Sequence, residues 1–331
     1  MKVLVTGGLG FIGSHISVDL LNKGYDVVII DNLSNSKVQV LDRIEDISSR
    51  RPVFYEQDIC NLDDLEVVFR DHRIDGIIHL AGFKAVGESV GDPLKYYYNN
   101  ILGTLQLLKC CDGFKVSKFI YSSSATVYGD QQSPLREDME LRRPTNPYGE
   151  TKVMIERILS DYACANPEFC LSVLRYFNPI GAHESGLIGE DPKGIPNNLM
   201  PYITKVAKGE LPFLGVYGND YETPDGTCIR DYIHVSDLSM GHISALENIS
   251  RGHQVYNLGT GRGRSVLEII NTFIEVNKVD IPYRIVDRRP GDIGTAYADV
   301  SKAKRVLKWE AKKSLEDMVR DSWNFAEKKS I

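Results

Sequence analysis

The chain has 331 residues, of which 42% are hydrophobic and 25% are charged, as is ordinary for a globular protein. Its formal net charge is −6 and it has no long block of Lys or Arg, which argues against nucleic acid or an anionic membrane as a partner. No run of 18 apolar residues occurs, so no membrane span is expected. The six cysteines form no C-x-x-C pair and no zinc-like spacing with the seven histidines. This usage predicts reduced thiols, a cytoplasmic location and no metal site.

Short apolar runs alternate with helical patterns in the first half of the chain. One of these helical patterns covers 15–23 and ends at Gly24, and the chain begins on an apolar strand pattern rather than on a signal peptide. Such alternation predicts a doubly wound parallel sheet with helices on both faces, an α/β fold. The expected strands are 2–6, 25–30, 53–56, 76–80, 118–122 and 171–176.

The second half of the chain has a different texture, with many Gly and Pro between 178 and 230. Strand-like residues 255–258 could rejoin the first sheet. The sequence predicts a first domain at 1–177 with a return segment at about 231–258, and a smaller mixed α/β domain formed by 178–230 and 259–331. The helical patterns of this half cover 237–248, 265–276 and 315–327.

Residues 6–13 read TGGLGFIG and place glycines between a strand and a helix. Gly7, Gly10 and Gly13 allow the backbone to turn tightly and to approach a pyrophosphate, which a helix N-terminus attracts. The spacing is G-x-x-G-x-x-G instead of the standard G-x-G-x-x-G. A dinucleotide site is therefore predicted, and a plain strand–helix turn remains the alternative.

Asp31 ends the second expected strand, 18 residues after Gly13. A carboxylate at this place accepts hydrogen bonds from the adenosine ribose and repels a 2′-phosphate, and the following NLSNS contains no Arg. The sequence therefore favours NAD over NADP, unless Asp31 is only a turn residue. Asp58 follows the next strand and could contact the adenine. Leu80 and Ala81 end the fourth strand, where a small residue lets the cofactor come close.

Tyr148 and Lys152 carry the sharpest chemical signal, because i, i+4 spacing places both side chains on one helical face. A free phenol has a pKa of about 10, and a nearby ammonium or a positively charged nicotinamide would lower it toward the range of a working base. Ser124 follows the fifth strand and could pass a proton between substrate and phenolate. The alternatives are an ordinary amphipathic helix and an ordinary serine-rich helix cap.

Longer motifs extend from Thr6 to Asp292 and identify a family resemblance. They resemble the extended short-chain dehydrogenase/reductase superfamily and, within it, the UDP-glucose (UDP-galactose) 4-epimerase family. The resemblance implies a Rossmann-like NAD-binding domain, a UDP-sugar substrate and an isomerase of galactose metabolism that acts through a transient 4-keto sugar. It also implies a homodimer, with helices near 99–111 and 149–163 at the interface. The motifs are TGGLGFIGSH, DNLSNS, HLAGFKAVGESV, SSSATVYG, NPYGETK, RYFNPIGAH, GIPNNLMPY, RDYIHV, NLGTG and RRPGD.

The family's residue roles transfer to matching positions of this chain. The catalytic positions are Ser124, Tyr148 and Lys152. The NAD-binding positions are Gly7, Gly10, Phe11, Ile12, Gly13, Asp31, Asn32, Asp58, Ile59, Leu80, Ala81, Lys84, Asn99, Ser122, Tyr148, Lys152 and Tyr176. The substrate-binding positions are Lys84, Ser124, Tyr148, Asn178, Asn198, Leu199, Tyr217, Arg230, Arg289, Asp292 and Ala296.

One position of the hexose pocket bears on substrate size. In this family it lies four residues after the Asp that matches Asp292, which gives Ala296. Alanine leaves room for an N-acetyl group, so the N-acetylhexosamine pair is expected as a second substrate pair. A one-residue slip, or a rotated Tyr297, would instead narrow the pocket.

Three other functions compete with epimerisation. A nucleotide-sugar 4,6-dehydratase needs a carboxyl acid/base pair directly after Ser124, and no Asp or Glu occurs there before Asp130. A UDP-glucuronate decarboxylase would likewise need an acid and an Arg near this serine. A non-catalytic sensor of NAD or nucleotide sugar would be expected to lose Tyr148 or Lys152.

Overall fold

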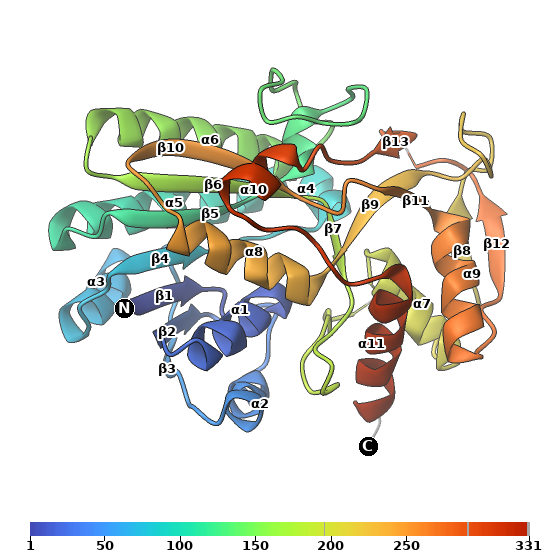
Figure 1. The fold of residues 1–331 in the computed structure, drawn as a ribbon, viewed down its shortest axis with the longest axis horizontal. Coiled ribbons are helices and arrows are strands. Elements are labelled where there is room, and N and C mark those ends of the chain that lie inside the picture. The colour runs from blue at the N-terminus through green and yellow to red at the C-terminus, as the bar shows by residue number, and fades with distance from the viewer. Residues whose placement is uncertain (195, 290, 330–331) are drawn as a thin grey trace.

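The computed structural model describes residues 1–194, 196–289 and 291–329. Its largest element is a seven-stranded parallel sheet in the order β10-β6-β5-β4-β1-β2-β3 (Figure 1). The predicted doubly wound, Rossmann-like sheet is thereby confirmed. The strands are β1 (Lys2–Thr6), β2 (Asp26–Asp31), β3 (Val53–Glu56), β4 (Gly76–His79), β5 (Lys118–Ser124), β6 (Cys170–Tyr176) and β10 (Gly252–Leu258).

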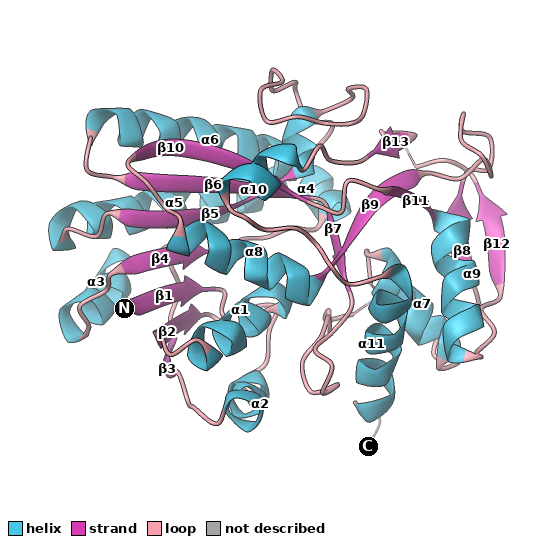
Figure 2. Cartoon of the chain, in the orientation of Figure 1, coloured by secondary structure: helices cyan, strands magenta, loops and turns pink. Residues whose placement is uncertain are grey.

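Helices cover both faces of this sheet, which explains why its strands are almost continuously apolar (Figure 2). In β1, Val3 and Val5 belong to the core on one face, whereas Leu4 belongs to the core on the other. The helices of the first face are α1 (Phe11–Asn22), α2 (Gln39–Ser48) and α8 (Val235–Glu247). Those of the second face are α3 (Leu62–Asp71), α5 (Pro93–Phe114) and α6 (Pro147–Ala165).

The strand order reverses direction at β1, which lies between β2 and β4. In open α/β sheets a ligand crevice forms at such a switch point, beyond the carboxyl ends of the strands. The far edge is formed by β10, which pairs in parallel with β6 although it follows β6 by more than 75 residues in the chain. The carboxyl ends of β1, β2, β4 and β5 carry the glycine turn, Asp31, Ala81 and Ser124.

A smaller mixed α/β unit lies beside the carboxyl edge and confirms the second part of the predicted fold class (Figure 1). Its main sheet has the order β11-β9-β13, with β7 also paired to β9, and β8 and β12 form a separate pair. The strands are β7 (Asn178–Ile180), β8 (Leu214–Tyr217), β9 (Ile229–His234), β11 (Gly263–Ser265), β12 (Tyr283–Val286) and β13 (Thr295–Ala296). The helices are α7 (Leu199–Ala207), α9 (Val266–Asn277) and α11 (Leu315–Lys328).

Three short helices complete the described chain, namely η1 (Ala125–Tyr128), α4 (Val86–Gly91) and α10 (Ser301–Val306). Within the three described ranges, no helix combines the length and apolar character that crossing a bilayer requires.

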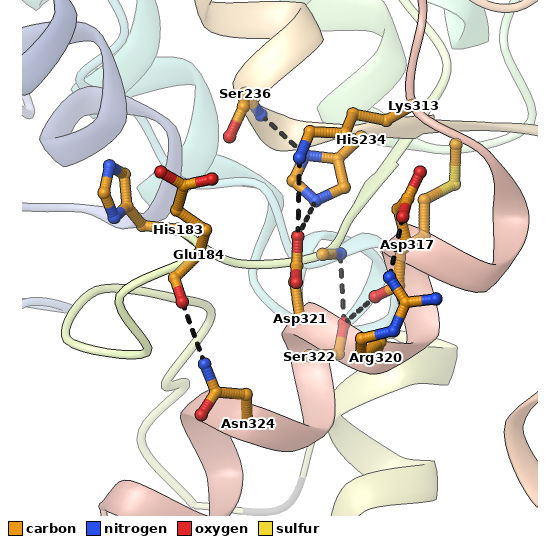
Figure 3. Close-up of polar contacts among 12 residues, drawn as sticks. His183, Glu184, His234, Ser236, Lys313, Asp317, Arg320, Asp321, Ser322 and Asn324 are labelled. Carbon is orange, nitrogen blue, oxygen red and sulfur yellow. Dashed lines mark hydrogen bonds and ion pairs between the residues drawn. The ribbon is translucent and has the colours of Figure 1, made fainter. Parts of the chain in front are cut away.

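Helix α11 is fixed to the end of β9 by a buried histidine (Figure 3). The Nδ1 atom of His234 accepts a hydrogen bond of 3.0 Å from the Ser236 amide, so Nε2 carries the proton and donates to Asp321 at 3.1 Å. On the same helix, Asn324 donates to the Glu184 carbonyl at 3.0 Å. These contacts hold the loop after β7 in place, and this loop contributes to the site described next.

Candidate active site

The glycine turn after β1 leaves no room for side chains at two of its positions. Gly7 has a φ of +68°, and a Cβ on it would lie 3.0 Å from the Ala81 backbone. A Cβ on Gly13 would lie 2.2 Å from the Gly7 carbonyl oxygen, so α1 can pack this closely only with glycine there. Gly10 caps α1 without a side-chain hydrogen bond, which leaves amide groups of the first turn available to an anion. The turn therefore fits a pyrophosphate.

Asp31 ties this turn to the loop after β2. Its carboxylate accepts hydrogen bonds from the Leu9 amide at 3.1 Å, the Leu33 amide at 3.0 Å and the Ser36 hydroxyl at 2.7 Å. Two carboxylate oxygens offer about four acceptor positions, so the carboxylate can still receive a ribose hydroxyl. The sequence indicated the carboxylate but not its role as an organiser of both loops. Beside it, Asn32 donates to Asp58 at 3.0 Å.

The other predicted cofactor residues fall into two groups. Leu80 and Ala81 follow β4, Ser122 lies in β5 and Tyr176 ends β6, so all four are at the carboxyl edge. Ile59 belongs to the core and packs so closely on α5 that a Cβ on Gly103 would lie 2.4 Å from it. Asn99 lies on α5, where its amide donates to Asn100 at 3.0 Å. Phe11 and Ile12 open α1 beside the glycines.

Tyr148 and Lys152 lie in the first turns of α6, which Asn146 caps by accepting the Gly149 amide at 2.9 Å. The Lys152 ammonium donates to the Ser122 carbonyl at 2.7 Å. It also lies 5.8 Å from the centre of the Tyr148 ring. The helix therefore presents phenol and ammonium to the end of β5, where Ser124 forms a hydrogen bond with Tyr148.

The electrostatics of the phenol combine burial with nearby positive charge. Burial raises the pKa of Tyr148, while the hydrogen bond with Ser124 and the positive charge of Lys84 oppose that rise. Lys84, which follows β4, thus acts on the phenol in addition to Lys152, whose ammonium lies near the Tyr148 ring and donates to the Ser122 carbonyl. Burial also lowers the pKa of Lys152 to about 8, against the influence of the Glu156 carboxylate.

A buried ion pair formed by α6 and β6 was not anticipated from the sequence. Glu156 of α6 and Arg175 of β6 form a bidentate pair, with N–O distances of 2.6 and 3.0 Å and side chains only 4% and 5% exposed. Ser123, the neighbour of Ser124, also donates to Glu156. The sequence gives one indication that Glu156 lies near the proposed site, because its i, i+4 spacing from Lys152 places both residues on one helical face. The pair connects α6, β5 and β6 directly behind the reacting groups.

Two arginines gather around one carboxylate on the side of the smaller unit. Arg230 of β9 lies 3.5 Å from Asp292, and Arg289 donates to the same carboxylate at 3.2 Å. The Arg289 guanidinium stacks 4.4 Å from the ring centre of Tyr217. The group carries an excess positive charge and offers several N–H donors, which suits a diphosphate.

The remaining predicted substrate residues lie around this group. Asn178 begins β7, and Asn198 and Leu199 stand at the start of α7. Ala296 lies in β13 directly opposite Arg230 of β9. Because side chains alternate between the two faces of a strand, Ala296 and Tyr297 point in opposite directions. A Cβ on Gly263 of β11 would lie 3.4 Å from the Tyr297 ring. Tyr297 therefore packs against β11, on the face opposite to that of Ala296.

The loop between β7 and α7 holds residues that sequence reasoning missed. Glu190 accepts hydrogen bonds from Lys84 at 2.9 Å and from Asn198 at 2.6 Å. Lys193 donates to the carbonyls of Leu33 and Ser34 at 2.8 and 3.1 Å. The loop thus crosses from the smaller unit to residues near both predicted halves of the dinucleotide site. No local pattern marks it, because its partners are distant in the chain.

A metal centre finds no support in the part of the chain that the structure describes, where no three His, Cys, Asp or Glu side chains are grouped to hold an ion.

Comparison with known proteins agrees with this geometry. Residues 4–322 match the family model described as GDP-mannose 4,6 dehydratase. The chain is 55% identical to the UDP-glucose 4-epimerase of Bacillus subtilis, over 98% of this chain and 96% of that protein. The corresponding protein of Pasteurella multocida is 53% identical, over 99% and 98% of the two chains.

Solved structures similar to this chain are also 4-epimerases of UDP-sugars. The UDP-glucose 4-epimerase of Bifidobacterium longum in complex with NAD+ and UDP superimposes with a TM-score of 0.97 at 51% identity, covering 100% of this chain and 99% of that chain. The UDP-Glc/GlcNAc 4-epimerase of Campylobacter jejuni superimposes with a TM-score of 0.86 at 36% identity, covering 99% of each chain.

Proposed function

The chain belongs to the UDP-glucose 4-epimerase family of extended short-chain dehydrogenases/reductases, and from this premise we propose that it inverts carbon 4 of a UDP-hexose with NAD as cofactor. UDP-glucose and UDP-galactose are the substrate pair. The observation that carries the proposal is the convergence of Ser124, Tyr148 and Lys152 at the carboxyl edge of the sheet that also holds the glycine turn. An arginine pair suited to a diphosphate lies on the facing unit.

The residues present fit NAD and divide its binding between them. The glycine turn would hold the pyrophosphate, and Asp31 would hold the adenosine ribose and disfavour a 2′-phosphate. When bound, NAD supplies a hydride acceptor that returns the hydride to the sugar in the same catalytic cycle. We assign the other predicted NAD-binding positions to the same cofactor, with Ile59 contributing through its backbone because its side chain belongs to the core.

Proton transfer falls to Tyr148. Its phenolate takes the proton of the sugar 4-hydroxyl as the hydride leaves carbon 4, with the Ser124 hydroxyl bridging the two oxygens. The phenol returns this proton after the 4-keto sugar has turned its other face to the cofactor. Arg230 and Arg289 hold the diphosphate during this rotation, so only the hexose moves. One base is sufficient because the proton and the hydride are both returned.

The competing dehydratase chemistry lacks its acid. Elimination of water needs a carboxyl group next to Ser124, but the segment after it is the short helix η1, which contains Ala125, Thr126 and Val127. A sensor function is not favoured either, because all three catalytic residues are present. The similarity to a family model described by a dehydratase therefore indicates shared fold and ancestry rather than shared elimination chemistry.

A direct assay tests the function. Purified protein given UDP-galactose should form UDP-glucose without added NAD and without net NADH. The nucleotide released by denaturing the protein should be NAD or NADH and not NADP. Formation of NADH in step with product would indicate a dehydrogenase, and recovery of NADP would contradict the role given to Asp31.

Ala296 should set the size of the accepted sugar. Its methyl group lies on the same face of β9–β13 as Arg230, which leaves space that a tyrosine would fill. We expect the enzyme to interconvert UDP-N-acetylglucosamine and UDP-N-acetylgalactosamine as well. Ala296→Tyr should lower kcat/KM for this pair by about 10- to 100-fold, as expected for overpacking, with little change for UDP-galactose. If the wild type ignores the N-acetyl sugars, the assignment of Ala296 is wrong.

A homodimer is proposed from the surface of α5 and α6. Leu94 and Tyr98 of α5 are 76% and 67% exposed and lie one turn apart, and Met154 of α6 is also exposed. Two such pairs of helices would cover this apolar surface as a four-helix interface. Sedimentation equilibrium should give about twice the chain mass of 37.2 kDa. Leu94→Asp combined with Tyr98→Asp should shift it toward the monomer, whereas Val38→Asp, at an exposed site on another face, should not.

We also propose a cytoplasmic location and a role in galactose metabolism. The six cysteines are unpaired, as expected for a cytoplasmic protein, and the substrate pair places the enzyme in galactose metabolism.

A further inference from the structure

The crossing loop, which we define as residues 183–193, is fixed at its start to helix α11. Asn324 of this helix donates to the Glu184 carbonyl at 3.0 Å (Figure 3). One helical turn further on, Lys328 donates to the Ser185 carbonyl at 2.7 Å. The loop is therefore held from the side of the smaller unit by two side chains that lie on one face of α11.

The crossing loop then packs on the start of α1, where the glycine turn ends. Ile188 is buried in the same core as Leu9 of the turn and Ile16 of α1. The ring of His183 lies 6.3 Å from the ring of His15, which is also on α1. Since the glycine turn is the proposed pyrophosphate site, the loop runs beside the middle of the cofactor site.

The end of the crossing loop contacts the segment that follows β2. Lys193 donates to the carbonyls of Leu33 and Ser34 at 2.8 and 3.1 Å. Asp191 forms an ion pair with Lys37 at 2.8 Å. Two charged side chains of the loop thus hold residues 33–37 from outside, across more than 150 positions of the chain.

The segment 33–37 borders the adenosine half of the cofactor site. Asp31, the residue proposed to hold the adenosine ribose, accepts hydrogen bonds from the Leu33 amide at 3.0 Å and the Ser36 hydroxyl at 2.7 Å. The segment therefore lies between the proposed ribose-binding carboxylate and the crossing loop. Any loosening of the loop would free this segment and open the adenosine side of the site.

We propose that Asp191 and Lys193 are positioning residues that hold the segment 33–37 around the adenosine and thereby keep NAD bound between catalytic cycles. The inference rests on the proposed function, in which each cycle regenerates NAD, so that release of the cofactor serves no purpose. Both residues act through the segment and not by touching the reacting atoms. Asp191 also forms an ion pair with Lys329, so one carboxylate links the segment to the C-terminal end of α11.

The test measures how fast radiolabelled NAD in the holoenzyme exchanges with an excess of unlabelled NAD. The variants are Asp191→Asn, Lys193→Met and their combination. Asp191 is partly exposed and Lys193 is exposed, and each replacement is similar in size, so folding should survive. Glu184→Gln is the matched control, because Glu184 is an exposed carboxylate of the same loop that contacts α11 through its backbone carbonyl.

Each single variant should raise the NAD exchange rate by about 2- to 10-fold, the effect of losing charged contacts near the surface, and the combination should raise it further. High salt should also raise the wild-type rate, because it screens exposed ion pairs, and it should have a smaller effect on Asp191→Asn. With excess NAD, kcat for UDP-galactose and the dissociation constant of UDP should stay close to the wild-type values. This pattern separates cofactor retention from a general loosening of the site.

Lys37→Met examines the same ion pair from the other side. Alone it should raise the exchange rate, but added to Asp191→Asn it should cause no further increase, because the pair is already broken. A further increase in this double variant would show that Lys37 acts on NAD without Asp191, which would contradict the inference.

Two other outcomes would overturn it. One is a wild-type exchange rate in both Asp191→Asn and Lys193→Met, or an equal increase in Glu184→Gln. The other is a loss of kcat or of UDP affinity as large as the gain in exchange rate, which would indicate a purely structural role. Failure of the proposed function would look different, because the wild-type protein would then leave UDP-galactose unchanged whatever its NAD exchange rate.

Discussion

Tyr148→Phe is expected to lower kcat for UDP-galactose by about 10²- to 10⁴-fold, the usual contribution of a positioned proton-transfer group. The change removes one oxygen from the residue that forms the hydrogen bond with Ser124 and senses the charge of Lys84. Bound NAD and UDP affinity should stay near wild-type values, because neither depends on this oxygen alone. Initial rates at saturating UDP-galactose, with the NAD content of each preparation, would measure the effect.

Tyr162→Phe is the matched control for this variant. Tyr162 lies on the same helix, packs on Phe169 at the far end from the site, and its side chain is not involved in the proposed chemistry. The pH dependence adds a second readout. Bound NAD would bring a positive charge that opposes the burial-driven rise of the Tyr148 pKa, so wild-type kcat should fall as the pH drops below the Tyr148 pKa of this complex, and the residual activity of Tyr148→Phe should lack this limb. Comparable rates in Tyr148→Phe and Tyr162→Phe would remove Tyr148 from the mechanism.

Arg175→Met is expected to destabilise the protein by about 3–5 kcal/mol, because it leaves the Glu156 carboxylate buried without its counter-ion. Replacing both partners, with Glu156→Leu added to Arg175→Met, should recover most of this loss, since apolar side chains of similar size tolerate such a site. Urea unfolding at fixed NAD concentration would measure the free energies. The single variant should also lose activity, because Ser123 and α6 are held by this pair directly behind Ser124.

Arg251→Met provides the surface comparison. Arg251 pairs with Glu168, but both side chains are more than 70% exposed, so the loss should be about 0–1 kcal/mol. An Arg175→Met variant no less stable than Arg251→Met would show that burial of the Glu156–Arg175 pair has no energetic consequence. A double variant as unstable as Arg175→Met would instead assign the stability to packing around the guanidinium.

The elements of the main sheet could be predicted from the sequence because their signals are local. Strands such as 2–6 and 118–122 contain consecutive apolar residues that a sheet covered on both faces can bury, and the structure places β1 and β5 there. The glycine turn was recognisable for a similar reason, since Gly7 adopts a positive φ and Gly13 lies against the turn itself. Helix α7 had no clear signal, as it is a short helix in a region rich in Gly and Pro.

The shared helical face of the proposed catalytic residues was also accessible from the sequence, but their contacts and electrostatics were not. The i, i+4 spacing of Tyr148 and Lys152 determines that they share a helical face. It does not determine that the Lys152 ammonium binds the Ser122 carbonyl, or that Lys84 also acts on the phenol. Those contacts depend on how β4, β5 and α6 are packed against one another.

The sequence by itself determined the fold class, the glycine turn after the first strand and the helix that carries Tyr148 and Lys152, because each depends on residues within a few positions of one another. Only the tertiary structure decided which distant groups meet. Glu190 contacts Lys84 across 106 residues, and β10 completes a sheet whose other strands all lie in the first half of the chain or close to it. Side chains so far apart leave no periodic pattern, since their contact is created by packing of the whole core and not by local backbone geometry.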